Sequence, residues 1–196
     1  MRKKNKLVFG VGINDADYHV YKRENGKKVW GCPYYRTWTD MLVRAYSDKY
    51  KQKHPTYEGV AVCEEWHSFM NFRSWMMQQE WKGKHLDKDI LVQGNKVYSP
   101  TTCVFVDSAV NKFLNDNAAS RGEWPIGVHW VEPRKKFMSL CCNPFTKKQE
   151  YLGYFHCPNQ AHKAWKKRKH ELACQLADIQ TDERVAEALR TRYSAP

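Results

Sequence analysis

Residues 126–177, IGVHWVEPRKKFMSLCCNPFTKKQEYLGYFHCPNQAHKAWKKRKHELACQLA, decide the fold of the C-terminal half of the chain. Apolar and polar residues alternate on both sides of Pro133–Lys135, which predicts two strands joined by a turn. The sequence EYLGYF at 150–155 supplies a third strand, and a helix follows over about Pro158–Ala177. We therefore expect an α+β chain in which this stretch forms a three-stranded antiparallel sheet packed on one helix.

Several side chains of this stretch suit contact with a polyanion. Period-two alternation places Val128 and Trp130 on one face of the first strand and His129 and Val131 on the other, and it leaves open which face meets a partner. Arginine suits a hairpin that contacts DNA, because it pairs with a base edge through two hydrogen bonds. The alternative is a solvated turn and a solvated helix face. The candidate DNA-binding residues are Trp130, Arg134, Lys135, Lys136, Lys163, Lys166 and Lys167.

The same stretch resembles the APETALA2/ethylene-response-factor type of DNA-binding domain, which also occurs in phage homing endonucleases. The matching features are Gly127 with Val128 at the opening strand, a basic turn, Leu152–Phe155 as a Leu-Gly-X-Phe strand, and Ala161 and Trp165 in the helix. The resemblance implies that the sheet binds double-stranded DNA, because a narrow β-ribbon fits the major groove.

The composition agrees with a polyanionic partner. Lys and Arg number 33 against 21 Asp and Glu, which gives a formal net charge of +12. No apolar run reaches the length of a membrane span, so we expect a soluble, cytoplasmic protein without a membrane partner. The 7 cysteines are odd in number and contain no CxxC pair. We therefore expect neither a disulfide framework nor a zinc site.

The N-terminal half predicts helices followed by short strands. Aromatic and apolar residues at helical spacing indicate a helix from Pro33 and a second one around Trp66–Met76. The stretch 86–106 indicates two short strands around a Gly-Asn turn, and a helix should follow over 108–114. The expected domains are a basic segment 1–31, a helical and ββα domain 32–115, a linker 116–125, the sheet module 126–177 and a helical tail 178–196.

Several blocks within residues 32–115 resemble a group of phage proteins described as HNH endonucleases. The resemblance implies a ββα site in which a base activates water and a divalent metal, here Mg²⁺, stabilises the scissile phosphate. Lys88 stands where the general base is expected, and Thr102 stands near the position of the central Asn. Alternate positions of the first strand would point together, which suggests His85 as a base or the two Asp residues as oxygen ligands. The candidate catalytic residues are His85, Asp87, Lys88, Asp89 and Asn111, and the candidate metal ligands are Asp87, Asp89, Asn95 and Asn111.

Three functions remain open on the sequence. The first is a homing-type endonuclease that cleaves double-stranded DNA with Mg²⁺, and the second is a DNA-binding protein that has kept the nuclease scaffold without its activity. The third is an RNA-binding component that stacks bases on Trp and Tyr, although most Trp residues fall at core spacings. The segment GVGINDAD at 10–17 has no assigned mechanism.

Overall fold

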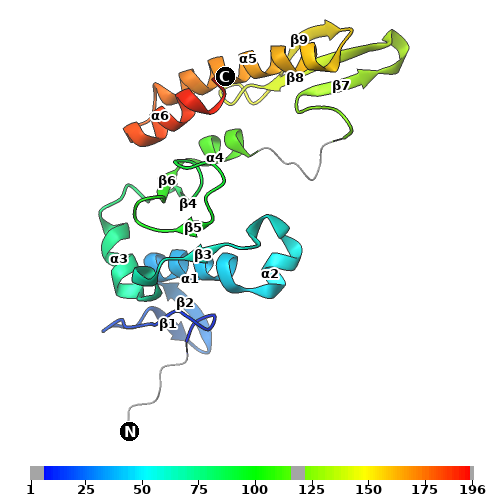
Figure 1. Ribbon diagram of the computed structural model, residues 1–196. Coiled ribbons are helices and arrows are strands. Elements are labelled where there is room, and N and C mark those ends of the chain that lie inside the picture. The colour runs from blue at the N-terminus through cyan, green and yellow to red at the C-terminus, as the bar shows by residue number, and fades with distance from the viewer. Residues whose placement is uncertain (1–6, 116–121, 195–196) are drawn as a thin grey trace. The chain divides into compact units, whose positions relative to one another are not determined.

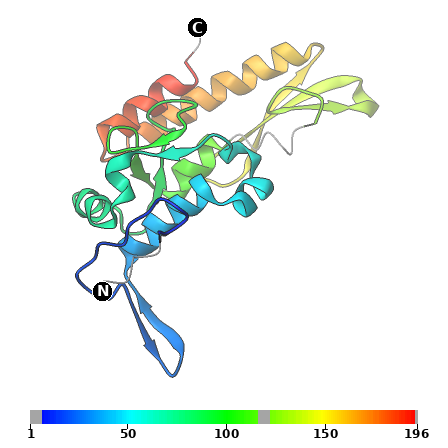
Figure 2. The ribbon, with the colours of Figure 1, turned by 60° about the horizontal axis from the view of Figure 1, so that its bottom comes forward.

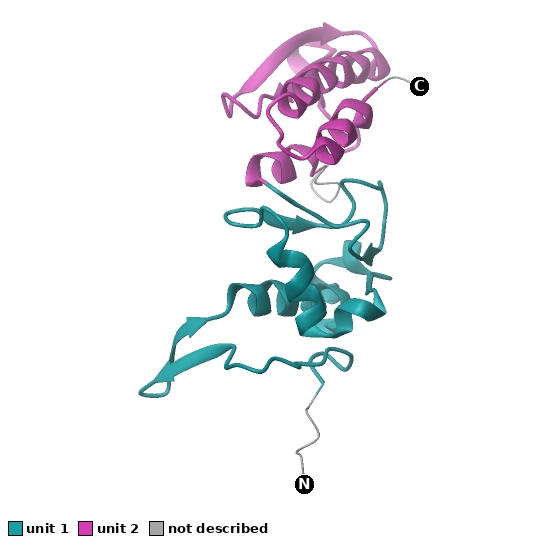
Figure 3. Ribbon diagram, turned by 90° about the vertical axis from the view of Figure 1, so that its left-hand side faces the viewer, with its two compact units in different colours: residues 1–106 teal, residues 107–196 magenta. Residues whose placement is uncertain are grey.

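A computed structural model describes residues 7–115 and 122–194 of the chain. Helices and strands are mixed, which confirms the α+β class, and the chain divides into two compact units, Met1–Val106 and Asp107–Pro196 (Figure 3). The expected linker lies largely outside the described residues. The units divide instead ahead of α4 (Ser108–Leu114), which therefore belongs to the second unit. None of the described helices is long and apolar enough to span a membrane.

Two helical segments, both seen in Figure 1, carry most of the residues that form the core of the first unit, many of them aromatic. The first segment is α1 (Pro33–Tyr46), and the second is η2 (Glu64–His67) running into α3 (Phe69–Met77). The indole Nε1 of Trp38 donates a hydrogen bond to the carbonyl of Trp66 at 2.8 Å. The helix predicted from Pro33 is confirmed, whereas the helix predicted around Trp66–Met76 is divided at Ser68, whose extended backbone ends η2 and caps α3. The fully buried residues of the two segments are Trp38, Met41, Leu42, Ala45, Trp66, Phe69, Phe72 and Met76.

A further helix forms where the sequence showed only a polar, lysine-rich segment. α2 (Asp48–Lys53) begins after Ser47, whose hydroxyl accepts a hydrogen bond from the N–H of Tyr50, and η1 (Pro55–Tyr57) follows. None of the residues of α2 is buried. Apolar periodicity therefore could not reveal this helix, although its N-terminal cap could have done so.

The segment 10–17 ties the start of the chain to α3. Ile13 bridges to Ser68, and the Asp15 carboxylate accepts hydrogen bonds from the Ser68 hydroxyl at 2.6 Å and from the Met70 N–H at 2.9 Å. A Cβ on Gly12 would lie 2.5 Å from Leu42 Cδ1, so only glycine fits there without displacing the core. This segment is therefore a structural clamp, with Asp15 satisfying donors at the start of a helix.

The stretch 86–106 forms three short strands, one more than predicted, in two separate two-stranded sheets. β4 (His85–Asp87) pairs antiparallel with β6 (Val104–Val106), and β5 (Val97–Tyr98) pairs parallel with β3 (Ala61–Val62). The predicted helix over 108–114 is confirmed as α4. We expected β4 and β5 to be neighbours across the turn. They lie in different sheets, because the chain after β4 turns towards β3.

The expected basic segment 1–31 contains a β-ribbon that we did not predict. β1 (Tyr21–Glu24) and β2 (Lys27–Gly31) pair antiparallel around Asn25 and Gly26, which both have positive φ. An Asn-Gly pair between two β-prone runs is the strongest short hairpin signal, so this ribbon was open to prediction.

The second unit contains the predicted sheet on a helix. β7 (Val128–Val131), β8 (Lys136–Cys142) and β9 (Gln149–Phe155) form an antiparallel sheet in sequence order, with η4 (Glu132–Arg134) in the first turn. α5 (Pro158–Ala177) packs on all three strands. Strands, turn and helix all match their predicted positions.

The helical tail expected over 178–196 is an integral part of this unit. α6 (Glu183–Arg192), capped by Asp182, packs on α5 and buries Val185 and Leu189. Beside it, Lys169 Nζ donates to the Phe113 carbonyl at 2.7 Å and lies 3.6 Å from the centroid of the Phe113 ring. The second unit therefore has buried residues between α4, α5 and α6. They add to the core of the sheet module, which buries little surface by itself because it is small.

Candidate nucleic-acid interface

One face of the sheet β7-β8-β9 is covered by α5, and the register identifies it. Val128 pairs with Ser139, and Ser139 Oγ is fully buried and donates to the Ala161 carbonyl at 2.8 Å. Phe137 and Cys141 share this inner face, because they alternate with exposed or half-buried neighbours along β8. The structure thus decides the question that the sequence left open: the side that carries Val128 packs on the helix.

The opposite face of the sheet, which we call the outer face, is not covered by the helix. Cross-strand pairs His129 with Met138 and Met138 with Tyr154 define it. A bulge at Leu152 then brings Tyr151 opposite Leu140. The side chains of the outer face are exposed or half-buried, and they are those of His129, Val131, Lys136, Met138, Leu140, Tyr151 and Tyr154.

A basic and aromatic row runs from the hairpin along β9. The guanidinium of Arg134 lies 4.9 Å from the ring centroid of Tyr154, and this ring lies 5.4 Å from that of Tyr151. Stacking on a ring holds a guanidinium in place while leaving its N–H donors available. Sequence reasoning selected Arg134 and Lys136 but missed both tyrosines and His129, which only the strand register places on the same face.

Two of the candidate DNA-binding residues, Trp130 and Lys135, are less well placed for contact with DNA at the outer face. Trp130 pairs with Phe137 on the inner side, where its indole N–H donates to the Glu132 carboxylate and its ring lies 4.8 Å from the Phe137 ring. Lys135 Nζ lies 3.5 Å from Glu132 Oε1 in an exposed ion pair, which contributes little. Glu132 thus engages the tryptophan and one of the three cations of the turn.

The candidate cations of α5 point away from the sheet. Lys163 and Lys167 are exposed, and Lys166 is half-buried, on a helix whose Ala161 and Trp165 face the inner side of the sheet. Positions 161 and 163 lie about 200° apart around a helix, so Lys163 faces away from the strands. Within the second unit, this cluster and the outer face are therefore on opposite sides of the sheet.

Of the two expected nuclease residues on β4, Asp87 has a structural role. Asp87 Oδ1 accepts hydrogen bonds from the N–H groups of Asp89 and Ile90, both at 2.8 Å. These bonds turn the chain at the end of the strand, so the alternation of His85, Asp87 and Asp89 on one face stops at Asp87. His85 is exposed at the start of the strand.

Lys88, at the position of the expected general base, is a buried donor. Its Nζ bonds to Asp89 Oδ2 at 2.9 Å and to the Asn95 carbonyl at 3.0 Å. The Asn95 amide returns hydrogen bonds to the carbonyls of Lys88 and Val97. Lys88 and Asn95 therefore close the loop between β4 and β5, in agreement with the turn role that the sequence allowed for Asn95.

The remaining expected residues are Thr102 and Asn111. Thr102 Oγ1 donates to the Val97 carbonyl at 2.8 Å in a turn, and Asn111 lies on α4 in the second unit. Within residues 7–115 and 122–194, no three His, Cys, Asp or Glu side chains gather as a metal-binding group. The assignment of Mg²⁺ to Asp87, Asp89, Asn95 and Asn111 stays a prediction from the resemblance.

Asp87 should make the stability of the first unit depend on pH. Burial, and then the neighbouring Asp89, raise the pKa of Asp87 above its ordinary value. A raised carboxyl pKa favours the protonated folded state, so this contribution to stability falls as pH rises from the ordinary Asp pKa through the raised value. Asp87→Asn keeps the acceptor oxygen and cannot ionise. We expect this variant to be more stable than the parent in urea at about pH 8 and to lose that advantage at about pH 4.

Asp87→Ala is the control for this experiment. It leaves two backbone N–H groups without their acceptor, so it should lower the free energy of unfolding by about 1 to 3 kcal/mol at both pH values. An Asn variant that loses as much stability as the Ala variant would contradict the role of Asp87 as a hydrogen-bond acceptor.

The cysteines divide into protected and accessible thiols. Burial raises the pKa of Cys103 to about 12 and that of Cys141 to about 11, whereas Cys142 is exposed. Because the thiolate is the reactive species, we expect iodoacetamide at about pH 8 to alkylate Cys142 and to leave Cys103 and Cys141 unmodified until urea is added. Peptide mapping by mass spectrometry measures this, and equal rates at the adjacent Cys141 and Cys142 would contradict it.

Comparison of the chain with protein-family models, with curated proteins and with solved structures finds no match in any of the three. The geometry of the chain itself is therefore the basis for a functional proposal.

Proposed function

We propose that the chain binds double-stranded DNA through the outer face of the sheet β7-β8-β9. The observation that carries the proposal is Arg134 stacked on Tyr154, with Lys136 at the start of β8, on a sheet face that α5 leaves open. Cations placed beside aromatic rings on this solvent-facing sheet keep their hydrogen-bond donors available to a partner. They are well suited to phosphates and base edges.

The dimensions of the sheet favour duplex DNA. The major groove is about 12 Å wide and admits β-strands, whereas the major groove of A-form RNA is too deep and narrow for side chains to read. Arginine offers two parallel donors to a guanine edge, and lysine and the tyrosine hydroxyls suit phosphates. The net charge of +12 adds a sequence-independent attraction to the same polymer.

Three of the eight tryptophans, all at the core spacings that the sequence indicated, are buried in the structure. Trp38 and Trp66 are fully buried, and Trp165 is 6% exposed. Base stacking needs an accessible ring face, so these tryptophans are not available for it. The exposed rings of the outer face belong to tyrosines that lie beside a cation.

Mg²⁺-dependent cleavage of DNA is a second candidate, proposed on the resemblance. The observation that favours it is the antiparallel pair β4–β6 followed directly by a helix in the sequence, which is the order that the resemblance implies. The raised pKa of Asp87 is also a property that catalytic carboxylates share. The structural roles of Lys88 and Asn95 favour the binding function over cleavage.

A salt-dependent mobility shift tests binding. We expect a short DNA duplex to be retarded at low salt, with an observed affinity that falls linearly on a double-logarithmic plot as salt rises. Equal affinity for duplex and single-stranded DNA, or no retardation, would remove the proposal. Incubation with supercoiled plasmid and Mg²⁺, Mn²⁺ or EDTA tests cleavage, with Asp87→Ala/Asp89→Ala as the control. Metal-dependent nicking that this variant lacks would establish the nuclease.

A further inference from the structure

Among the described residues of the first unit, β1 and β2 contact chiefly each other. The base of this ribbon is closed by buried Val20 and Cys32, where the Cys32 N–H donates to the Val20 carbonyl at 2.8 Å. Beyond that base, every residue of both strands is exposed except half-buried Gly31. Figure 2 shows the ribbon extending as a finger away from the helices of its unit. A two-stranded ribbon without packing partners is only marginally stable in water. Burial in the core of the unit therefore does not account for the presence of this ribbon.

The charge of the ribbon indicates the kind of surface that it meets. Its strands carry four cations, Lys22, Arg23, Lys27 and Lys28, and one carboxylate, Glu24. Self-repulsion among these cations disfavours the ribbon in isolation, and neutralisation by an anionic polymer would remove that cost. Exposed Trp30 and Tyr21 add apolar and aromatic surface to the same element.

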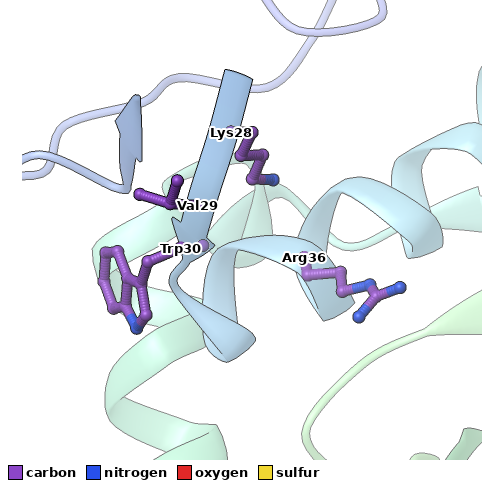
Figure 4. Close-up of a pocket in the computed structure, with 5 residues that line it drawn as sticks. Lys28, Val29, Trp30 and Arg36 are labelled. Atoms are coloured by element: carbon purple, nitrogen blue, oxygen red, sulfur yellow. The ribbon is translucent and has the colours of Figure 1, made fainter. Parts of the chain in front are cut away.

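Both sides of the ribbon carry this combination. Arg23 and Lys28 are cross-strand partners, and both lie over the ring of Tyr21, at 5.6 and 5.9 Å from its centroid. The register of the two strands shifts between Lys22 and Arg23. Trp30 therefore pairs with Lys22, on the side of the ribbon opposite to Arg23 and Lys28. Figure 4 shows this division along β2: Lys28 lies on the side towards which Arg36 extends from α1, whereas Val29 and Trp30 lie on the other.

We infer that the ribbon β1–β2 is a second DNA-binding element, which enters the major groove of a duplex with its Asn25-Gly26 tip. The major groove admits a two-stranded β-ribbon, and cations on both sides would meet the phosphates of both groove walls. The tip is narrow, because Gly26 has no side chain and both tip residues take the positive φ of a tight hairpin turn. The inference shares its ligand with the proposed function, but it rests on different residues in a different unit.

The test compares two full-length variants that lose equal charge. Arg23→Ala/Lys27→Ala/Lys28→Ala removes three cations of the ribbon, and Lys49→Ala/Lys53→Ala/Lys82→Ala removes three exposed lysines elsewhere in the same unit. We expect the ribbon variant to bind a short duplex at least about tenfold more weakly and to show a double-logarithmic salt slope smaller by about 3, because each cation that meets a phosphate contributes about one unit. The control variant should change the slope by less than about one.

The outcomes separate this inference from the proposed function. Equal loss in the two triple variants overturns the ribbon contact, because net charge alone then explains binding. A ribbon variant that binds like the parent, while Arg134→Ala/Lys136→Ala binds about 100-fold more weakly, overturns the ribbon and supports the sheet. Loss in the ribbon variant alone supports the ribbon and overturns the sheet. An unchanged melting temperature, expected because the ribbon lies outside the core, verifies that the core of each variant is folded.

Discussion

Arg134→Ala/Lys136→Ala should weaken binding of a short DNA duplex by about 100-fold, or about 2.7 kcal/mol at 25 °C. Arg134 is held over the Tyr154 ring and keeps its donors for a base edge or phosphate, and loss of such a contact costs about 1 to 3 kcal/mol. Lys136, next along β8, adds a phosphate contact whose loss lowers the salt slope by about one. Titration by fluorescence anisotropy at several salt concentrations measures both quantities.

Lys163→Ala/Lys167→Ala is the matched comparison, because it removes the same charge from the same unit. Both lysines are exposed on the side of α5 that faces away from the strands, so a duplex seated on the outer face does not reach them. We expect a loss of less than about fivefold, from long-range attraction alone. A larger loss of affinity in Lys163→Ala/Lys167→Ala than in Arg134→Ala/Lys136→Ala would indicate that α5 contacts DNA and would refute the outer face as the interface.

Gly127→Ala should have the largest effect on folding, lowering the free energy of unfolding of the second unit by about 3 to 5 kcal/mol. A Cβ at this position would lie 2.0 Å from Trp165 Cδ1, and the backbone has a φ of +80°. Trp165 cannot move aside easily, because its ring is stacked on His162 at 5.4 Å and meets the Tyr193 ring edge-on at 6.0 Å. Urea unfolding followed by circular dichroism measures the loss, and hydrogen exchange in peptides of β8 and α5 assigns it to this unit.

Gly83→Ala separates backbone strain from the clash. Gly83 has a φ of +75°, but nothing lies within 4 Å of the position of its Cβ. We expect it to cost about 1 kcal/mol, the backbone strain alone. If the two alanine variants lose the same stability, the close packing of Trp165 on Gly127 does not contribute.

Local signals in the sequence predicted the sheet module well. Alternation bounded by Pro133 and a proline at the start of α5 place three strands and a helix with little ambiguity, because each signal acts over a few residues. The ribbon at 21–31 carried an equally local signal in Asn25-Gly26, and we missed it by describing residues 1–31 only as a basic segment. The outer face was predicted only in part, since Arg134 and Lys136 are visible as charges whereas Tyr151 joins them through a bulge.

The expected nuclease site shows where sequence reasoning ends. Period-two alternation assumes a continuing strand, yet the Asp87 carboxylate turns the backbone at Asp89 and Ile90, and a buried Lys88 anchors the loop. The long-range partners of these side chains have no signature in their own sequence neighbourhood.

The sequence alone thus determined the class of fold, the basic character and the strands and helix of residues 126–177, because these follow from hydrophobic periodicity, proline and charge. Only the tertiary structure decided which sheet face is open, that α6 completes the core of the second unit, and that Asp15 clamps α3. These features depend on contacts between residues far apart in the chain. Such contacts are determined by packing and by the satisfaction of hydrogen bonds across the whole unit, and not by local propensity.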